Sequence, residues 1–198
     1  MKKTLLLLGT LLLTVGSAFA YSMPRWGMTA IDVYLPENQY SQLVRSSFDE
    51  WSNASGGRIR FRYASTRFAS TNAPIKVVFL NERTRYYLTQ SQRSETTGYF
   101  TNMDQGFISR ATLTIYEKNR FDEIPDPDQL RNEILHEIGY ILGLEKIFRD
   151  CGQEEQDASI MCVPSLSKDS SITDLDRASI VRKYDRSNDD IKQRKNRN

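Results

Sequence analysis

One stretch, residues 132–146, constrains this chain more than any other, because it contains the only histidine in the protein. It reads NEILHEIGYILGLEK, so that Glu137 directly follows His136. Apolar residues recur in it every three or four positions, which predicts an amphipathic helix, and Gly143 supplies a glycine stop. An imidazole beside a carboxylate on one helix is therefore the first candidate for chemistry.

The first 20 residues have the composition of a Sec-type signal peptide. Lys2 and Lys3 form a basic start, Leu5–Val15 is a short apolar run, and the small-residue sequence Ala-Phe-Ala ends at Ala20. The run is too short for a comfortable membrane span, which disfavours the alternative of a retained anchor. We expect cleavage after Ala20, a secreted or periplasmic protein, and no membrane association after cleavage.

Length and charge favour one neutral domain after the signal peptide. The chain has 27 basic and 25 acidic residues, and two of the basic ones lie in the signal peptide. There is no basic stripe of the kind that nucleic-acid binding needs, so we expect no nucleic-acid partner. We expect a single monomeric domain over residues 21–184, and a disordered polar tail over residues 185–198.

The order of predicted elements is that of a mixed α/β (α+β) domain with one twisted sheet and three main helices. Periodicity predicts strands at 29–35, 59–63, 75–80, 98–101 and 111–116, and helices at 40–51, 128–142 and 173–184. Asp128 is expected as the N-cap of the second helix. The polar segment 102–106 is expected to be a turn. Calcium binding there is a weaker alternative, because one aspartate supplies few oxygen ligands.

Several further motifs surround the His136-Glu137 helix in a fixed order. They are PRW at 24–26, FDEW at 48–51, GGRIRF at 56–61, GY at 98–99, SIM at 159–161 and the apolar pattern at 175–184. Together with the helix they resemble the catalytic domain of a matrixin, a metzincin zinc endopeptidase. The resemblance covers residues 24–184, which is nearly the whole chain after the signal peptide.

The resemblance implies specific roles for four residues. The family helix reads His-Glu-x-x-His-x-x-Gly-x-x-His, so His136 matches the first zinc ligand, Glu137 the general base and Gly143 the turn. Met161 matches the Met-turn beneath the metal. Three imidazoles leave one zinc position open for a water molecule, which the glutamate deprotonates. The implied substrate is a peptide or protein segment extended along a sheet edge.

Two of the three ligand positions are replaced in this chain. Tyr140 stands at the second, and its phenol must lose a proton whose ordinary pKa is about 10 before it can bind zinc well. Lys146 stands at the third, and an ammonium group has no lone pair and repels a dication. No other histidine exists to replace them, so zinc is implied by the family but lacks its ligands.

The two cysteines, Cys151 and Cys162, are expected to form a disulfide in an exported protein. The bond would close a short loop and contribute on the order of 3 kcal/mol. An alternative is a rebuilt zinc site of His136 and both thiolates, which the oxidising compartment and an unfamiliar spacing disfavour. An oxygen ligand from Glu145 or Asp150 is weaker still. The sequence position of Lys146 also suggests that it places a positive charge near Glu137, at the place that zinc occupies in the matrixin family.

Three functions remain open from the sequence. The first is a zinc-deficient pseudopeptidase of the matrixin-like metallopeptidase family that keeps a peptide-binding cleft. The second is an active zinc-dependent metalloendopeptidase with an atypical ligand set. The third is a non-enzymatic secreted binding module, in which Arg58, Arg60 and Arg62 bind an anionic partner rather than forming a solvated or salt-bridged face.

Overall fold

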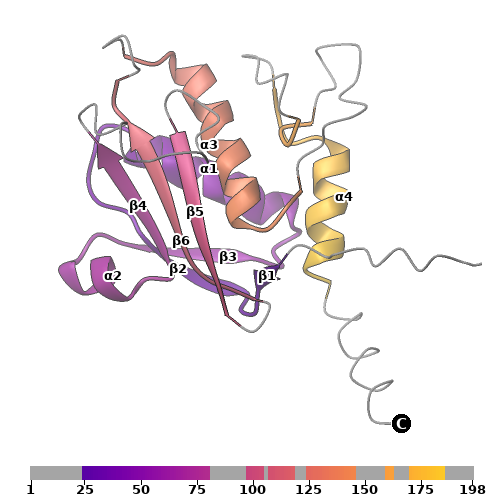
Figure 1. The fold of residues 1–198 in the computed structure, drawn as a ribbon. Helices are drawn as coiled ribbons and strands as arrows, with labels where there is room; N and C mark the ends of the chain where they lie inside the picture. Colours follow the sequence, from indigo (N-terminus) through magenta and orange to yellow (C-terminus); the bar gives the residue numbers. More distant parts are fainter. Residues whose placement is uncertain are drawn as a thin grey trace, which may run out of the picture.

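A computed structural model describes residues 24–80, 97–104, 107–118, 124–145, 159–162 and 170–185. This part of the chain forms six strands and four helices in mixed α/β order (Figure 1). They are β1 (Arg25–Trp26), β2 (Ala30–Tyr34), α1 (Ser41–Ala54), β3 (Arg60–Ala64), α2 (Arg67–Asn72), β4 (Ile75–Leu80), β5 (Thr97–Asp104), β6 (Phe107–Tyr116), α3 (Pro127–Ile141) and α4 (Asp174–Lys183).

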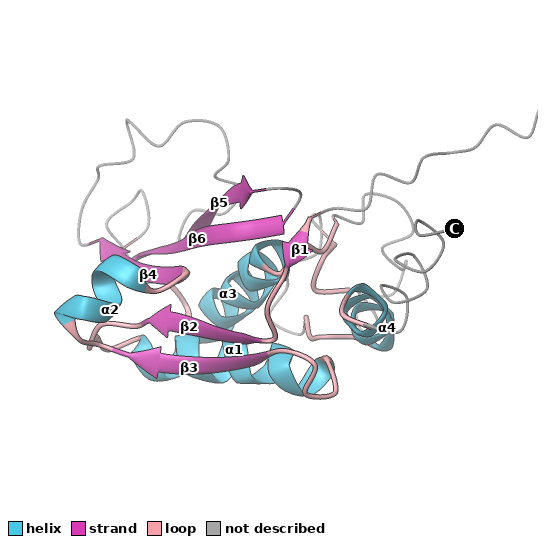
Figure 2. Ribbon diagram, turned by 90° about the horizontal axis from the view of Figure 1, so that it is seen from below, coloured by secondary structure: helices cyan, strands magenta, loops and turns pink. Residues whose placement is uncertain are grey.

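The sheet is mostly parallel and has one antiparallel edge. Its order is β1-β6-β4-β2-β3, and β5 pairs antiparallel with β6 (Figure 2). The β5–β6 register runs from Thr97 opposite Ile115 to Asp104 opposite Phe107, with an irregularity after Asn102. Among the described strands, β5 pairs only with β6, and β3 pairs only with β2. These two strands are therefore the edges of the sheet.

One face of the sheet forms the core together with α1 and α3. Its strands alternate buried and exposed residues, as expected for a sheet with one covered face. The inward side chains include Ile31, Val33, Ile75, Val77, Leu113 and Ile115, and all are fully buried. Helix α3 packs against α1, β5 and β6, so the helix that carries His136 lies in the centre of the domain.

Helix α1 contributes an apolar stripe whose largest members are Phe48 and Trp51, both fully buried. The ring of Phe48 lies 4.8 Å from that of Phe61. The Nε1 of Trp51 donates to the Leu135 carbonyl at 2.8 Å, which ties α1 directly to α3. Gly56 follows the helix with a φ of 63°, in the left-handed region, which suits a glycine at the end of a helix.

Helix α3 begins one residue earlier than predicted, and the prediction of Asp128 as its N-cap was wrong. Asp126 is the N-cap, and its side chain accepts from the backbone N–H groups of Asp128 and Gln129 at 3.1 and 3.3 Å. Pro127 occupies the first turn, where its missing N–H costs nothing and its fixed φ suits the helix.

The C-terminus of α3 ends in a Schellman motif, as its glycine predicted. Gly143 has a φ of 80° and donates to the Tyr140 carbonyl at 2.7 Å, while Leu144 donates to the Gly139 carbonyl at 2.9 Å. A Cβ atom at Gly143 would lie 2.0 Å from the Pro24 carbonyl oxygen. The position therefore requires glycine both for its backbone conformation and for the close approach of the N-terminal strand.

The predicted strands are all present, and two are longer than expected. Asn102, Met103 and Asp104 belong to β5, so the turn predicted at 102–106 is shorter, and residues 105 and 106 lie outside the described chain. Strand β1 and helix α2 were not predicted. None of the described helices is both long and apolar enough to span a bilayer. The signal peptide and the tail after Asp185 lie outside the described residues and stay predictions.

Candidate functional site

The three residues of interest on α3 are buried. His136, Glu137 and Tyr140 expose only 2%, 1% and 4% of their surfaces. Helix α3 is covered by α1, by the sheet and by the turn at residues 159–162, so a polar stripe on it lies inside the protein. These side chains are thus held by packing, in contrast to groups that line an open, water-filled site.

One ring nitrogen of His136 is hydrogen-bonded to the backbone. Its Nδ1 lies 2.6 Å from the carbonyl oxygen of Ile160. A carbonyl can only accept, so Nδ1 carries the proton and donates, which leaves Nε2 as the basic nitrogen of the neutral imidazole. The contact fixes the tautomer and the orientation of the ring.

Tyr140, one helical turn after His136, packs directly against it. The two ring centroids are 4.7 Å apart and the ring planes meet at 87°, an edge-to-face arrangement. Residues four apart on a helix face the same way. The side chain at the predicted second ligand position therefore lies beside the imidazole as an aromatic packing partner.

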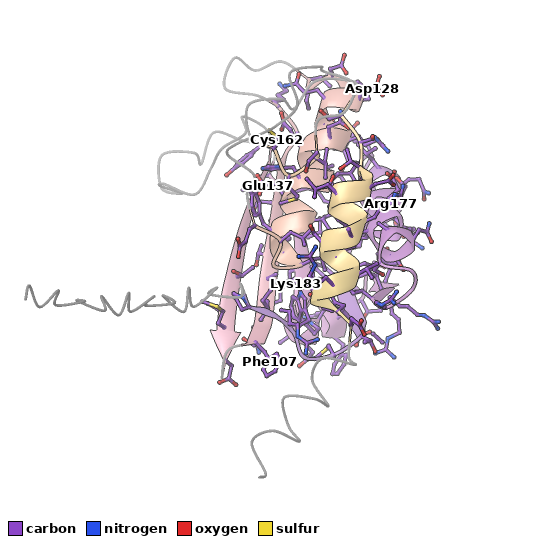
Figure 3. The ribbon with its side chains drawn as sticks, turned by 90° about the vertical axis from the view of Figure 1, so that its right-hand side faces the viewer. Phe107, Asp128, Glu137, Cys162, Arg177 and Lys183 are labelled. Carbon is purple, nitrogen blue, oxygen red and sulfur yellow. The ribbon has the colours of Figure 1, made fainter. Side chains whose placement is uncertain are left out.

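The turn at residues 159–162 lies against α3, as the matrixin resemblance implies for Met161. Cys162 donates to the Ser159 carbonyl at 2.8 Å, and the Met161 N–H donates to the Ser159 hydroxyl oxygen at 3.0 Å. Met161 is buried, and a Cβ atom at Gly139 would lie 2.2 Å from its sulfur. The missing side chain at Gly139 therefore makes room for the methionine. Figure 3 labels Glu137 on α3 and Cys162 of the turn.

Asp176 holds this turn in place, a role that the sequence reading missed. Its buried carboxylate accepts hydrogen bonds from the Ser159 hydroxyl, the Ile160 N–H, and both the N–H and the hydroxyl of Thr173. Thr173 and Asp176 form a capping box at the start of α4. The four donors and the positive end of the helix compensate the burial of a charge. The Thr-x-x-Asp spacing was the available signal.

The N-terminal strand closes the other end of α3. Trp26 Nε1 donates to the Ile141 carbonyl at 2.9 Å, and the Tyr184 hydroxyl donates to the Leu142 carbonyl at 2.9 Å. The stem of Lys183 lies over Gly143. Burial is the main cause that lowers the pKa of Lys183; Glu145 opposes the shift and Arg25 adds to it, and the resulting pKa is about 8.

Several predicted site residues lie outside the described chain. Lys146 and Cys151 are among them, as is Asp150. The placement of Lys146 near Glu137 therefore stays a prediction. Cys162 is disulfide-bonded, as expected, while its expected partner Cys151 lies outside the described residues. Cys162 itself is fully buried next to Met161.

The described residues do not fit a zinc or calcium ion. In these ranges no three His, Cys, Asp or Glu side chains are grouped closely enough to hold a metal. The helix offers one imidazole, one carboxylate and a phenol that packs on the imidazole, whereas catalytic zinc takes three protein ligands and a water. Asn102 and Asp104, the expected calcium oxygens, lie along strand β5 rather than in a ligand loop.

Two of the three arginines of the binding-module hypothesis make contacts within the domain. Arg62 forms a two-pronged ion pair with Asp32, at 2.7 and 3.0 Å. Arg58 donates to the Ser55 carbonyl at 3.1 Å and so supports the turn after α1. The salt-bridge interpretation is confirmed for Arg62, while Arg60 is exposed at the start of β3.

The edge strand β5 packs beside α3. Its exposed residues include Met103, with 63% of its surface accessible. The helix of His136 and an antiparallel sheet edge therefore lie next to each other.

Comparisons with known proteins found no protein-family model and no curated protein sequence that matches this chain.

Proposed function

We propose that this protein is a secreted matrixin-like domain that has lost the zinc chemistry of that family and binds extended peptides. One observation carries the family part of the proposal. The turn at 159–162 lies against α3, with the Ile160 carbonyl on His136 and Met161 against Gly139. These segments are distant in sequence, and the resemblance implies their meeting. Helical periodicity alone does not predict this contact.

The loss of zinc chemistry is supported by the donor set. Peptide hydrolysis on zinc needs a metal that keeps an open position and lowers the pKa of a bound water. Here the second ligand position is an aromatic ring in contact with His136. Glu137, which would act as the base, is 1% exposed.

Peptide binding is supported by the contrast between the two sheet edges. The β3 edge carries Arg60 and Arg62, and charged side chains are a common means of preventing further strand pairing. The described side chains of β5, from Thr101 to Asp104, include no basic group. An extended peptide can add to such an edge through main-chain hydrogen bonds. Strand β5 is therefore the proposed binding edge.

The test places a lysine on that edge. Met103→Lys is expected to weaken binding about tenfold, since a lysine on an edge strand opposes pairing with another chain. The probe is a library of eight-residue peptides, measured by fluorescence polarisation on the mature protein. Phe68→Lys is the matched control, because Phe68 is 77% exposed on α2, away from β5.

If both lysine variants bind peptides equally weakly, β5 is not the binding edge. If no peptide binds at concentrations of about 1 mM, the proposal of peptide binding is wrong. Mass spectrometry of the same mixtures separates binding from hydrolysis. Intact peptides are expected. Cleavage that a chelator stops and that Glu137→Gln also stops would establish the active endopeptidase instead.

A further inference from the structure

We infer that Tyr140 fills the space of the metal and excludes divalent cations from His136, an inference that rests on the proposed family. The position is thus closed by packing, rather than merely short of ligands. The distinction matters because an open site with too few ligands still binds zinc weakly, whereas a filled one does not.

The helix geometry places Tyr140 where it competes with an ion. Side chains four apart on a helix share one side, and this spacing lets two histidines hold one zinc ion. A phenol at the second position projects toward the same space. Its ring lies 4.7 Å from the imidazole, edge to face, and Tyr140 is 4% exposed. An ion on the side of the imidazole that faces Tyr140 would therefore meet a buried aromatic ring.

His136 has little freedom to turn away from that ring. Its Nδ1 is bonded to the Ile160 carbonyl at 2.6 Å. Ile160 is held in turn through its N–H by the carboxylate of Asp176 at 3.2 Å. Metal binding would need Nε2 of His136, and the imidazole cannot swing to present this nitrogen elsewhere without losing the Nδ1 bond. The histidine is a fixed part of the core, and Tyr140 is its packing partner.

Binding of zinc alone to the mature protein tests this inference. The wild type and Lys146→His, which keeps Tyr140, are expected to show no heat of zinc binding and no change in Tm with zinc or EDTA. Tyr140→His is expected to bind zinc through the His pair, and about 1 mM zinc should raise its Tm by several degrees. Tyr140→Phe, which keeps the ring, is expected to behave as the wild type.

Zinc binding by Lys146→His or by Tyr140→Phe would overturn the inference, and so would a folded Tyr140→His protein that ignores zinc. A second measurement does not depend on the folding of any variant. The single histidine gives one set of imidazole resonances in the wild type, which zinc should leave unchanged. A shift or broadening of these resonances would contradict the inference. Neither experiment measures peptide binding at β5, so the inference and the proposed function fail separately.

Discussion

Replacing Asp176 by alanine is expected to lower the free energy of unfolding by about 3–5 kcal/mol. The substitution leaves buried donors at Ser159 and Ile160 without their acceptor, and it removes the carboxylate of the α4 capping box. Because the same carboxylate holds the Ile160 residue that His136 contacts, the imidazole resonances of His136 should also shift. Urea unfolding and NMR of the mature protein measure the two effects.

Asp174→Ala is the matched control for this prediction. Asp174 lies in the same first turn of α4, but it is fully exposed and its ion pair with Arg177 is long, at 3.9 Å. Its loss should change stability little and leave the His136 resonances in place. If the two alanine variants unfold at the same urea concentration, Asp176 does not join the turn to α4 as described.

Gly143→Ala is expected to cost about 2–5 kcal/mol. An alanine in the left-handed region costs about 1–2 kcal/mol. The new Cβ atom would also lie 2.0 Å from the Pro24 carbonyl oxygen, and relieving such overpacking typically costs about 1–3 kcal/mol more. Since Pro24 precedes Trp26, which is bonded to α3 through the Ile141 carbonyl, tryptophan fluorescence should change as well.

Gly57→Ala separates the cost of the left-handed backbone conformation from the cost of the steric overlap with Pro24. Gly57 has a similar φ of 73°, but a Cβ atom there would meet nothing within 4 Å. Its substitution is expected to cost only the backbone term, about 1–2 kcal/mol. A Gly143→Ala protein that is no less stable than Gly57→Ala would mean that the N-terminal strand does not lie against the end of α3.

The regular elements could be predicted because their signals are local. Alternating apolar residues predicted β2 and β3, a dense apolar run predicted β4, and helical spacing predicted α1. The start of α3 was misjudged because Asp126 and Asp128 flank Pro127, and both are good capping residues. The structure uses Asp126, which places Pro127 in the first turn. Helix α2 has no buried residue, so it left no apolar period to detect.

The candidate site was predictable only in part, since most of it consists of long-range contacts. Met161 lies against Gly139 of α3, while its role as a Met-turn stays a prediction, and no periodicity indicates that Ile160 would accept from His136. The role of Asp176 was not predicted, because nothing in the sequence links it to Ser159. Gly139 likewise gave no sign that the Met161 sulfur would occupy the space of its missing side chain.

Under the proposed matrixin-like origin, Tyr140 at a ligand position has a structural consequence beyond the proposed loss of zinc chemistry. A metal site would join α3 to distant segments through coordination bonds. In this protein the described connections are hydrogen bonds and packing, notably His136 to Ile160 and Asp176 to the same turn. The domain should therefore fold without metal, in contrast to small domains in which metal binding supplies the folding energy.

The most direct test of the account is the zinc content of the wild-type mature protein. The protein is exposed to excess zinc at neutral pH, dialysed against metal-free buffer and analysed by elemental mass spectrometry. The filled position at Tyr140 and the single histidine predict a content far below one zinc ion per chain. One zinc ion per chain that survives dialysis, together with peptide cleavage that Glu137→Gln abolishes, would contradict it.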